Sequence, residues 1–218
     1  MKALIGDELD KYVYDHTTPH ETLFERLREE TFATLDMPQM QVGRVEGQFL
    51  KMMVQSLGAK RVLEIGTYSG YSGMCIASGL PEDGELITCD VDPKATEVAR
   101  RFFDESPWGA KITIKLGPAI ETIQLLRQQM EHDGAGFDLV FIDADKKGYV
   151  EYYEAVLPML SDRGVILADN TLWSGKVLEP EEPTDHAIVR FNEHVQADER
   201  TENVLLSVRD GILMIRKK

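Results

Sequence analysis

The stretch from Arg61 to Gly73, RVLEIGTYSGYSG, constrains the fold of this chain more than any other. It opens with a short apolar run, Val62 to Ile65, which is long enough for one buried strand, and then turns through Gly66 and Gly70. The residues that follow, Met74 to Ala77, are typical of a helix. A strand, a glycine turn and a helix form the first half of a βαβ unit, in which a nucleotide-like ligand lies over the turn. Glycine lets the backbone approach that ligand closely.

Two features separate this turn from a dinucleotide-binding turn. The spacing Gly66-x-x-x-Gly70 differs from the Gly-x-Gly-x-x-Gly pattern of such sites. Glu64, inside the strand, would repel a pyrophosphate but suits a cationic amino-acid ligand. An NAD-dependent dehydrogenase on a doubly wound sheet is therefore the weaker alternative, and a tight turn that binds no ligand is another.

The composition limits the classes of partner. The chain has 218 residues, a length common for one α/β domain. Acidic residues outnumber basic ones 38 to 24, which gives a net charge of −14. A protein that neutralises phosphates needs clustered Lys and Arg, so neither nucleic acid nor an anionic membrane is an expected partner.

The cysteines and the apolar runs bear on the cellular compartment. Cys75 and Cys89 fall inside a predicted helix and a predicted strand, where small buried residues are expected. The sequence shows no signal peptide, and no apolar run approaches the length of a transmembrane helix. These patterns predict a cytoplasmic protein with reduced cysteines.

The order of the predicted elements indicates the architecture. Residues 1 to 58 are predicted to be helical, with Thr18 as the N-cap of one helix and Pro19 in its first turn. Apolar runs then alternate with helical segments that begin near Gly70, Pro93, Ala119 and Gly148. The predicted strands are Val62–Ile65, Leu86–Cys89, Ile112–Lys115, Leu139–Ile142 and Val165–Ala168. This alternation is typical of a doubly wound, mostly parallel sheet with helices on both faces.

The C-terminal segment follows another pattern. A helix is predicted from about Thr184 to Val195, followed by two apolar runs, Asn203–Val208 and Ile212–Ile215. The residues between those runs include Asp210-Gly211, a strong hairpin signal. The last two strands should therefore be antiparallel to each other, which brings the predicted total to seven strands.

Several predicted strands end at polar residues. Asp90 follows the second strand, about 20 residues after the glycine turn. An acidic side chain at this spacing commonly binds ribose hydroxyls. Asp143 follows the fourth strand, and Asp169 and Asn170 follow the fifth. If these strands are neighbours, about 4.8 Å apart, the two carboxylates emerge side by side and repel unless a cation lies between them. Their oxygen donors suit Mg²⁺, and the absence of His or Cys nearby argues against zinc. Alternatively, Asp169-Asn170 only caps a turn.

Four segments together resemble a known family. They are Met40-x-Val-Gly, Leu63-Glu-Ile-Gly66, Phe141-Ile-Asp-Ala-Asp-Lys146 and Asp169-Asn-Thr-Leu-Trp-Ser-Gly-Lys-Val177. From about Met40 to the C-terminus, the chain resembles the cation-dependent O-methyltransferases that use S-adenosylmethionine, including catechol and caffeoyl-coenzyme A O-methyltransferases. The resemblance implies a class I methyltransferase fold of the Rossmann-like type, with a helical cap over residues 1–58 and a cofactor-binding core over residues 59–218. A non-catalytic relative that only binds ligands is the remaining alternative.

The resemblance also implies a role for each matching residue. The cofactor-binding positions are Met40, Val42, Glu64, Gly66, Thr67, Ser72, Asp90, Val91, Ala119 and Asp143. Asp143, Asp169 and Asn170 match ligands of Mg²⁺, or of another divalent cation such as Mn²⁺ or Ca²⁺. Lys146 matches the catalytic base, which acts with Asp143. Lys146, Asn170 and Trp173 are the expected contacts of a small catechol-type acceptor.

Two further expectations concern the base and the assembly. Partly desolvated and beside a cation, Lys146 is expected to have a depressed pKa that suits a base. A homodimer is expected, because the N-terminal helices, residues 161–165 and the terminal hairpin offer apolar surface.

Overall fold

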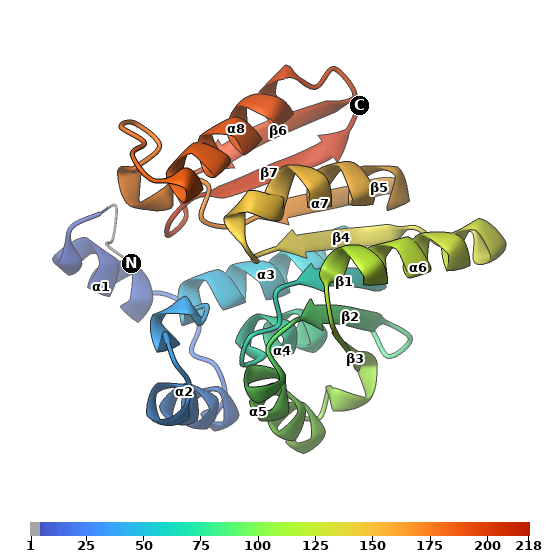
Figure 1. Cartoon of the computed structure of the whole chain (residues 1–218). Coiled ribbons are helices and arrows are strands. Elements are labelled where there is room, and N and C mark those ends of the chain that lie inside the picture. Colours follow the sequence, from blue (N-terminus) through green and yellow to red (C-terminus); the bar gives the residue numbers. More distant parts are fainter. Residues whose placement is uncertain (1–4) are drawn as a thin grey trace.

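A seven-stranded sheet with helices on both faces forms the centre of the molecule (Figure 1). The computed structural model describes residues 5–218, apart from the side chains of residues 131 and 133. The strands are β1 Arg61–Ile65, β2 Glu85–Asp90, β3 Ile112–Leu116, β4 Phe137–Ile142, β5 Leu160–Ala168, β6 Thr201–Leu206 and β7 Ile212–Lys217. Their order across the sheet is β3-β2-β1-β4-β5-β7-β6.

The helices alternate with the strands after an all-helical N-terminal region. They are α1 Asp7–Asp15, α2 Thr22–Thr34, α3 Arg44–Leu57, α4 Tyr71–Gly79, α5 Pro93–Glu105, α6 Ala119–Asp133, α7 Tyr149–Val156 and α8 Pro183–Ala197. Short 3₁₀ turns are η1 Pro38–Met40, η2 Gly109–Lys111, η3 Lys146–Gly148, η4 Leu157–Met159 and η5 Trp173–Gly175.

The sheet topology confirms the predicted fold class. Strands β1 to β5 pair in parallel, and β7 is antiparallel to both β5 and β6. The predicted terminal hairpin is therefore present. Its five-residue connection, residues 207–211, includes Arg209 and Gly211 with positive φ angles of 52° and 91°.

The predicted N-cap at Thr18 is wrong. The observed N-cap is Glu21, three residues later, and helix α2 begins at Thr22. The segment before it stays non-helical, and His20 Nδ1 lies 2.9 Å from the hydroxyl of Tyr71. The His20 ring also packs on Phe24, with 4.6 Å between ring centroids. These contacts with the core outweigh the local helix-start signal.

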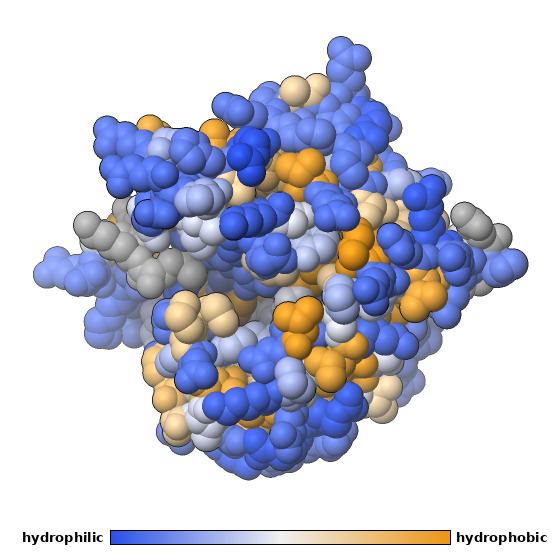
Figure 2. Space-filling model, in the orientation of Figure 1, coloured by the Kyte–Doolittle hydropathy of each residue, from blue (hydrophilic) through white to orange (hydrophobic). Residues whose placement is uncertain are grey.

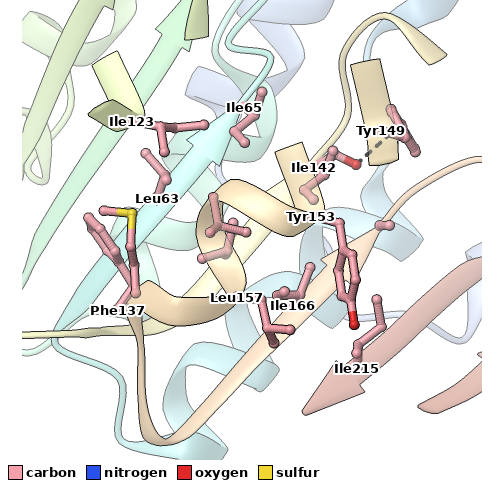
Figure 3. Close-up of a cluster of buried hydrophobic side chains, with 14 of the residues drawn as sticks. Leu63, Ile65, Ile123, Phe137, Ile142, Tyr149, Tyr153, Leu157, Ile166 and Ile215 are labelled. Carbon is pink, nitrogen blue, oxygen red and sulfur yellow. Dashed lines mark hydrogen bonds between the residues drawn. The ribbon is translucent and has the colours of Figure 1, made fainter. Parts of the chain in front are cut away.

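Successive side chains of each central strand point to opposite faces of the sheet, as the two-residue period of a strand requires. In β1, Leu63 belongs to a buried cluster that includes residues of α6, α7 and α8, while Val62 belongs to one that includes residues of α3 and α4. Figure 3 shows the first of these clusters, in which Leu63 and Ile65 lie near Ile123 of α6. Fully burying one such aliphatic side chain contributes roughly 1.5–3 kcal/mol.

The surface and the helix lengths agree with the composition. The face in Figure 2 is mostly hydrophilic, with hydrophobic residues in small separate groups. None of the helices within residues 5–218 has the length and hydropathy needed to cross a membrane. Cys75 and Cys89 are both buried free thiols, as predicted.

The strand pairing places the site. Residue Ile65 at the end of β1 is in register with Cys89 of β2 and Ile142 of β4, and Ile142 is in register with Ala168 of β5. The carboxyl ends of four neighbouring strands therefore form one edge, and the residues that follow them converge there.

Candidate functional site

A cavity of about 710 Å³ opens at this edge of the sheet. It is lined by most of the predicted site residues: Met40, Val42, Gly66, Thr67, Ser72, Asp90, Val91, Ala119, Asp143, Lys146, Asn170 and Trp173. The two remaining ones, Glu64 and Asp169, are buried and do not line the cavity. One cavity thus collects side chains from the N-terminal region and from the ends of several strands.

The turn after β1 requires glycine. Gly66 has a φ of 107°, and a Cβ there would overlap the carbonyl oxygen of Asp143. Its N–H donates to the carbonyl of Cys89 at 2.9 Å, while the N–H of Asp143 donates to Ile65 at 2.8 Å. Hydrogen bonds to β2 and to the residue after β4 therefore hold the turn in place, and its other side borders the cavity.

Asp90 at the end of β2 is held by the backbone. Its carboxylate accepts hydrogen bonds from the N–H of Tyr68 at 2.6 Å and from that of Asp92 at 2.9 Å. These bonds fix the carboxylate at the cavity wall, where its remaining lone pairs can accept from a ligand hydroxyl.

Glu64 is an ionisable group in the interior of the sheet. Its side chain is 0% exposed, and Oε2 accepts a hydrogen bond of 2.6 Å from the hydroxyl of Thr88. Burial raises the pKa of Glu64 to about 8, and hydrogen bonds from Ser72 and Thr88 only partly oppose that rise. Oε1 is buried and has no hydrogen-bond partner among the described residues. A cationic group reaching this position would favour the ionised form.

Asp143, Asp169 and Asn170 come together as the strand pairing predicts. The N–H of Asp169 donates to the carbonyl of Ile142 at 2.9 Å, which places Asp169 beside Asp143. Asp169 Oδ2 accepts from the amide of Asn170 at 2.8 Å. Burial, followed by the charge of Asp143, raises the pKa of Asp169 to about 7. The two carboxylates thus repel each other in a poorly solvated place.

These residues fit a divalent cation. Asp169 Oδ1 is buried and lacks a hydrogen-bond partner within the described part of the chain. Asp143 and Asp169 supply hard carboxylate oxygens and Asn170 supplies a carbonyl, the donor types that Mg²⁺, Mn²⁺ and Ca²⁺ accept. No group of three or more His, Cys, Asp or Glu residues with metal-binding geometry occurs among the described residues. The candidate set contains only two carboxylates, so its third donor would be the Asn170 amide.

Lys146 is nearly buried and is held in one position. Its Nζ lies 3.0 Å from Asp143 Oδ1 and 2.5 Å from the hydroxyl of Tyr149. It also lies over the ring of Trp173, 5.7 Å from the centroid. Burial would lower the pKa of Lys146, but Tyr149, Asp143 and Asp169 outweigh burial and raise it. The predicted depression assumes a cation beside Lys146, and in the protein alone the neighbouring groups instead stabilise the ammonium.

Tyr149 was missed by the sequence analysis. It is fully buried at the start of α7 (Figure 3), and its hydroxyl lies 3.3 Å from the carbonyl of Ile142 and 3.1 Å from that of Asp169. One phenol therefore connects the ends of β4 and β5 with Lys146. Its spacing, three residues after Lys146, was the only sequence signal.

Glu46 of α3 was also missed. It is buried, and its Oε2 lies 4.0 Å from Nε of Arg209. Burial, followed by the charges of Asp169 and Asp143, raises its pKa well above the usual range. No sequence pattern links α3 with residues so far along the chain, so only the folded structure reveals this contact.

Comparison with known proteins gives a consistent result. Residues 14–218 match the family model described as O-methyltransferase. The chain is 34% identical to caffeoyl-CoA O-methyltransferase 2 of Zea mays over 226 residues, which cover 99% of this chain and 85% of the maize protein. It is 36% identical to tricin synthase 1 of Oryza sativa subsp. japonica over 228 residues, with coverages of 98% and 89%.

Solved structures share the fold along nearly the whole chain. An O-methyltransferase from Bacillus cereus in complex with SAH has a TM-score of 0.85 and 30% identity, and 97% of each chain is covered. The SAH-bound methyltransferase PaMTH1 of Podospora anserina has a TM-score of 0.88 and 25% identity, with 100% of both chains covered. The fold class predicted from the sequence is confirmed.

Proposed function

The chain belongs to the cation-dependent, S-adenosylmethionine-using O-methyltransferase family, and from that premise we propose that it methylates one hydroxyl of a catechol-type small molecule. The observation that carries the proposal is the grouping of Asp143, Asn170 and Lys146 in the cavity wall, with the buried Asp169 bonded to Asn170. A dehydrogenase does not agree with the family match, and its glycine pattern is absent from the turn after β1.

The other end of the cavity suits the methyl donor. We assign the amino-acid part of S-adenosylmethionine to Glu64 and Ser72, and its ribose to Asp90. The adenine lies beside Val91 and Ala119 in this assignment, and Met40, Val42, Gly66 and Thr67 complete the donor wall. The donor is positively charged, which agrees with the acidic residues at these strand ends.

A divalent cation held by Asp143, Asp169 and Asn170 would stabilise negative charge on an acceptor hydroxyl and so make it a better nucleophile. In the transfer, the acceptor loses its hydroxyl proton and its oxygen bonds to the methyl carbon. The methyl–sulfur bond breaks, and its electron pair stays on sulfur. Alignment of the two substrates would supply much of the remaining rate enhancement.

Lys146 is assigned as the base that takes the hydroxyl proton of the acceptor. Nζ of Lys146 lies 3.0 Å from Asp143 and 5.7 Å from the ring centroid of Trp173. An acceptor bound beside Asp143 and Trp173 would therefore reach this amine. The raised pKa of Lys146 depends in part on Asp143 and Asp169. Neutralising those two charges by a cation would lower that pKa toward a value that suits a base.

The pH dependence of donor binding should show whether Glu64 binds the ammonium group of the donor. Since burial holds the pKa of Glu64 near about 8, most of the free protein is neutral at this position at pH 7. Donor affinity should therefore rise with pH between about 6 and about 7.5, by up to about tenfold per unit, because only the ionised form attracts the donor's ammonium. Isothermal titration measures this, and Glu64→Gln should bind more weakly and lose most of the slope. A slope that persists in this variant would reassign the effect to another group.

We further propose that the protein forms a homodimer. Apolar side chains remain exposed on the N-terminal helices, including Leu9, Tyr12 and Phe32 at 53%, 58% and 52%, and on the edge strand β6, including Val204 at 48%. The expected contribution of residues 161–165 needs correction, because Val165 is buried inside β5. Light scattering at micromolar concentration should give twice the 24.6 kDa mass of the chain, and a monomer would refute the dimer.

The test of the function is a labelled-donor assay with a panel of catechols, run with Mg²⁺ and after treatment with EDTA. Transfer is expected only with the metal, and a matched monophenol, which has one hydroxyl instead of two, should be a far poorer acceptor. Equal rates in metal-free protein would refute the cation-assisted reaction. Donor binding without any transfer would favour a non-catalytic binding protein.

A further inference from the structure

Asp210 is a buried carboxylate in the cavity wall that the proposed reaction does not use. It lies in the β6–β7 connection, and its side chain is 2% exposed. Oδ1 accepts a hydrogen bond of 2.5 Å from the N–H of Ser174. Oδ2 is buried and has no hydrogen-bond partner among residues 5–218. A buried carboxylate oxygen without a donor is costly, so this atom is free to accept a hydrogen bond from a group outside the described residues.

The hairpin holds Asp210 rigidly against the loop after β5. The N–H of Leu172 donates to the carbonyl of Asp210 at 2.9 Å, and that of Thr171 donates to Gly211 at 3.0 Å. Gly211 has a φ of 91°, and a Cβ there would lie 2.5 Å from the Leu172 side chain. The carboxylate is thus fixed next to the loop that carries Asn170 and Trp173, on the acceptor side of the cavity.

The lysines of the cavity wall are engaged elsewhere. Lys146 Nζ donates to Asp143 and Tyr149, and Lys176 lies 3.5 Å from Asp185. Asp143 is paired with Lys146 at 3.0 Å, so neither lysine of the cavity wall forms an ion pair with Asp210 in the described chain. Because an ionised carboxylate oxygen only accepts hydrogen bonds, a ligand group that meets Asp210 Oδ2 should be a hydrogen-bond donor, neutral or cationic.

We propose that Asp210 Oδ2 accepts a hydrogen bond from the methyl acceptor, and that the acceptor is a catechol bearing a further donor group, a hydroxyl or an ammonium. This inference rests on the proposed function and adds a specificity-determining residue to it. A site built to bind a donor discriminates strongly against an analogue that lacks it, since the buried oxygen is then left without a partner.

The test compares matched acceptors in the wild type and in Asp210→Asn. One pair is 4-(hydroxymethyl)catechol and 4-methylcatechol, and the other is 4-(2-aminoethyl)catechol and 4-ethylcatechol. The asparagine keeps an oxygen for the Ser174 N–H but places a donor where Oδ2 accepts. The wild type should prefer the donor-bearing member of at least one pair by about tenfold or more in kcat/KM, and Asp210→Asn should bring that ratio close to 1.

The control is Asp138→Asn. Asp138 is a partly buried carboxylate at the opposite end of β4 that accepts from the N–H of Lys60 and from Ser161, outside the cavity. This variant should keep the wild-type ratio. Ratios that are the same in the wild type and in Asp210→Asn for both pairs would overturn the assignment while leaving the proposed function intact. Absence of transfer to every catechol would instead refute the proposed function, and the acceptor contact with it.

Discussion

Asp169→Ala should lower turnover of a catechol by at least about 10³-fold, because the variant loses a carboxylate that would hold the cation. The removed group is buried, and its nearest acidic neighbours, Asp143 and Glu46, belong to other segments and do not occupy its position. Donor affinity should stay within about threefold of the wild type, since Asp169 is assigned to the cation and not to any part of the donor. Steady-state kinetics and titration with S-adenosylmethionine measure the two effects separately.

Asp169→Asn provides the variant that preserves the fold. The amide keeps the shape of the side chain but removes its charge. Mn²⁺ binding, measured by titration, should therefore be weaker, while the thermal unfolding temperature changes little. A second control is Asp162→Ala, which removes an exposed carboxylate from the same strand and should affect neither quantity. If Asp169→Asn bound Mn²⁺ and turned over like the wild type, Asp169 would be a turn residue only.

The sheet and its polar edge were predictable because each relevant signal was local. Apolar runs that stop at a carboxylate indicated where β2, β4 and β5 end, and the observed ends lie at Asp90, Ile142 and Ala168. The sequence analysis had to assume that β4 and β5 are neighbours, and the register Ile142↔Ala168 shows that they pair. Parallel order then brings Asp143 and Asp169 together without further information.

Other parts of the site depend on contacts between distant segments. Glu46 reaches the two aspartates from α3, and Asp210 could be interpreted only as a turn residue of a hairpin. Thr18 had a sound helix-start pattern, yet the docking of His20 on Tyr71 and Phe24 determined where α2 begins. In the folded chain without a cation, Tyr149 and the two aspartates raise the pKa of Lys146, and the sequence did not predict this contact with Tyr149. None of these effects has a local sequence pattern.

Lys146→Ala should reduce kcat by about 10²- to 10⁴-fold and change the acceptor KM much less, as expected for a group that acts on the proton in the transition state. Lys146→Arg separates charge from proton transfer. A guanidinium can keep the ion pair with Asp143, which lies 3.0 Å from Nζ, but it does not give up a proton in a protein. Arginine should therefore be nearly as impaired as alanine if Lys146 is the base.

The neighbouring Lys147 provides the matched control. It is exposed and adjacent in sequence, whereas Lys146 is 9% exposed and donates to Asp143 and Tyr149. Lys147→Ala should retain the wild-type kcat. If Lys146→Arg also retained it, a positive charge beside Asp143 would be sufficient, and the proton would have to leave by another route, such as solvent. If Lys146→Arg lost activity while thermal unfolding and donor affinity remained normal, the loss would lie in the proton-transfer step and not in the packing around Tyr149.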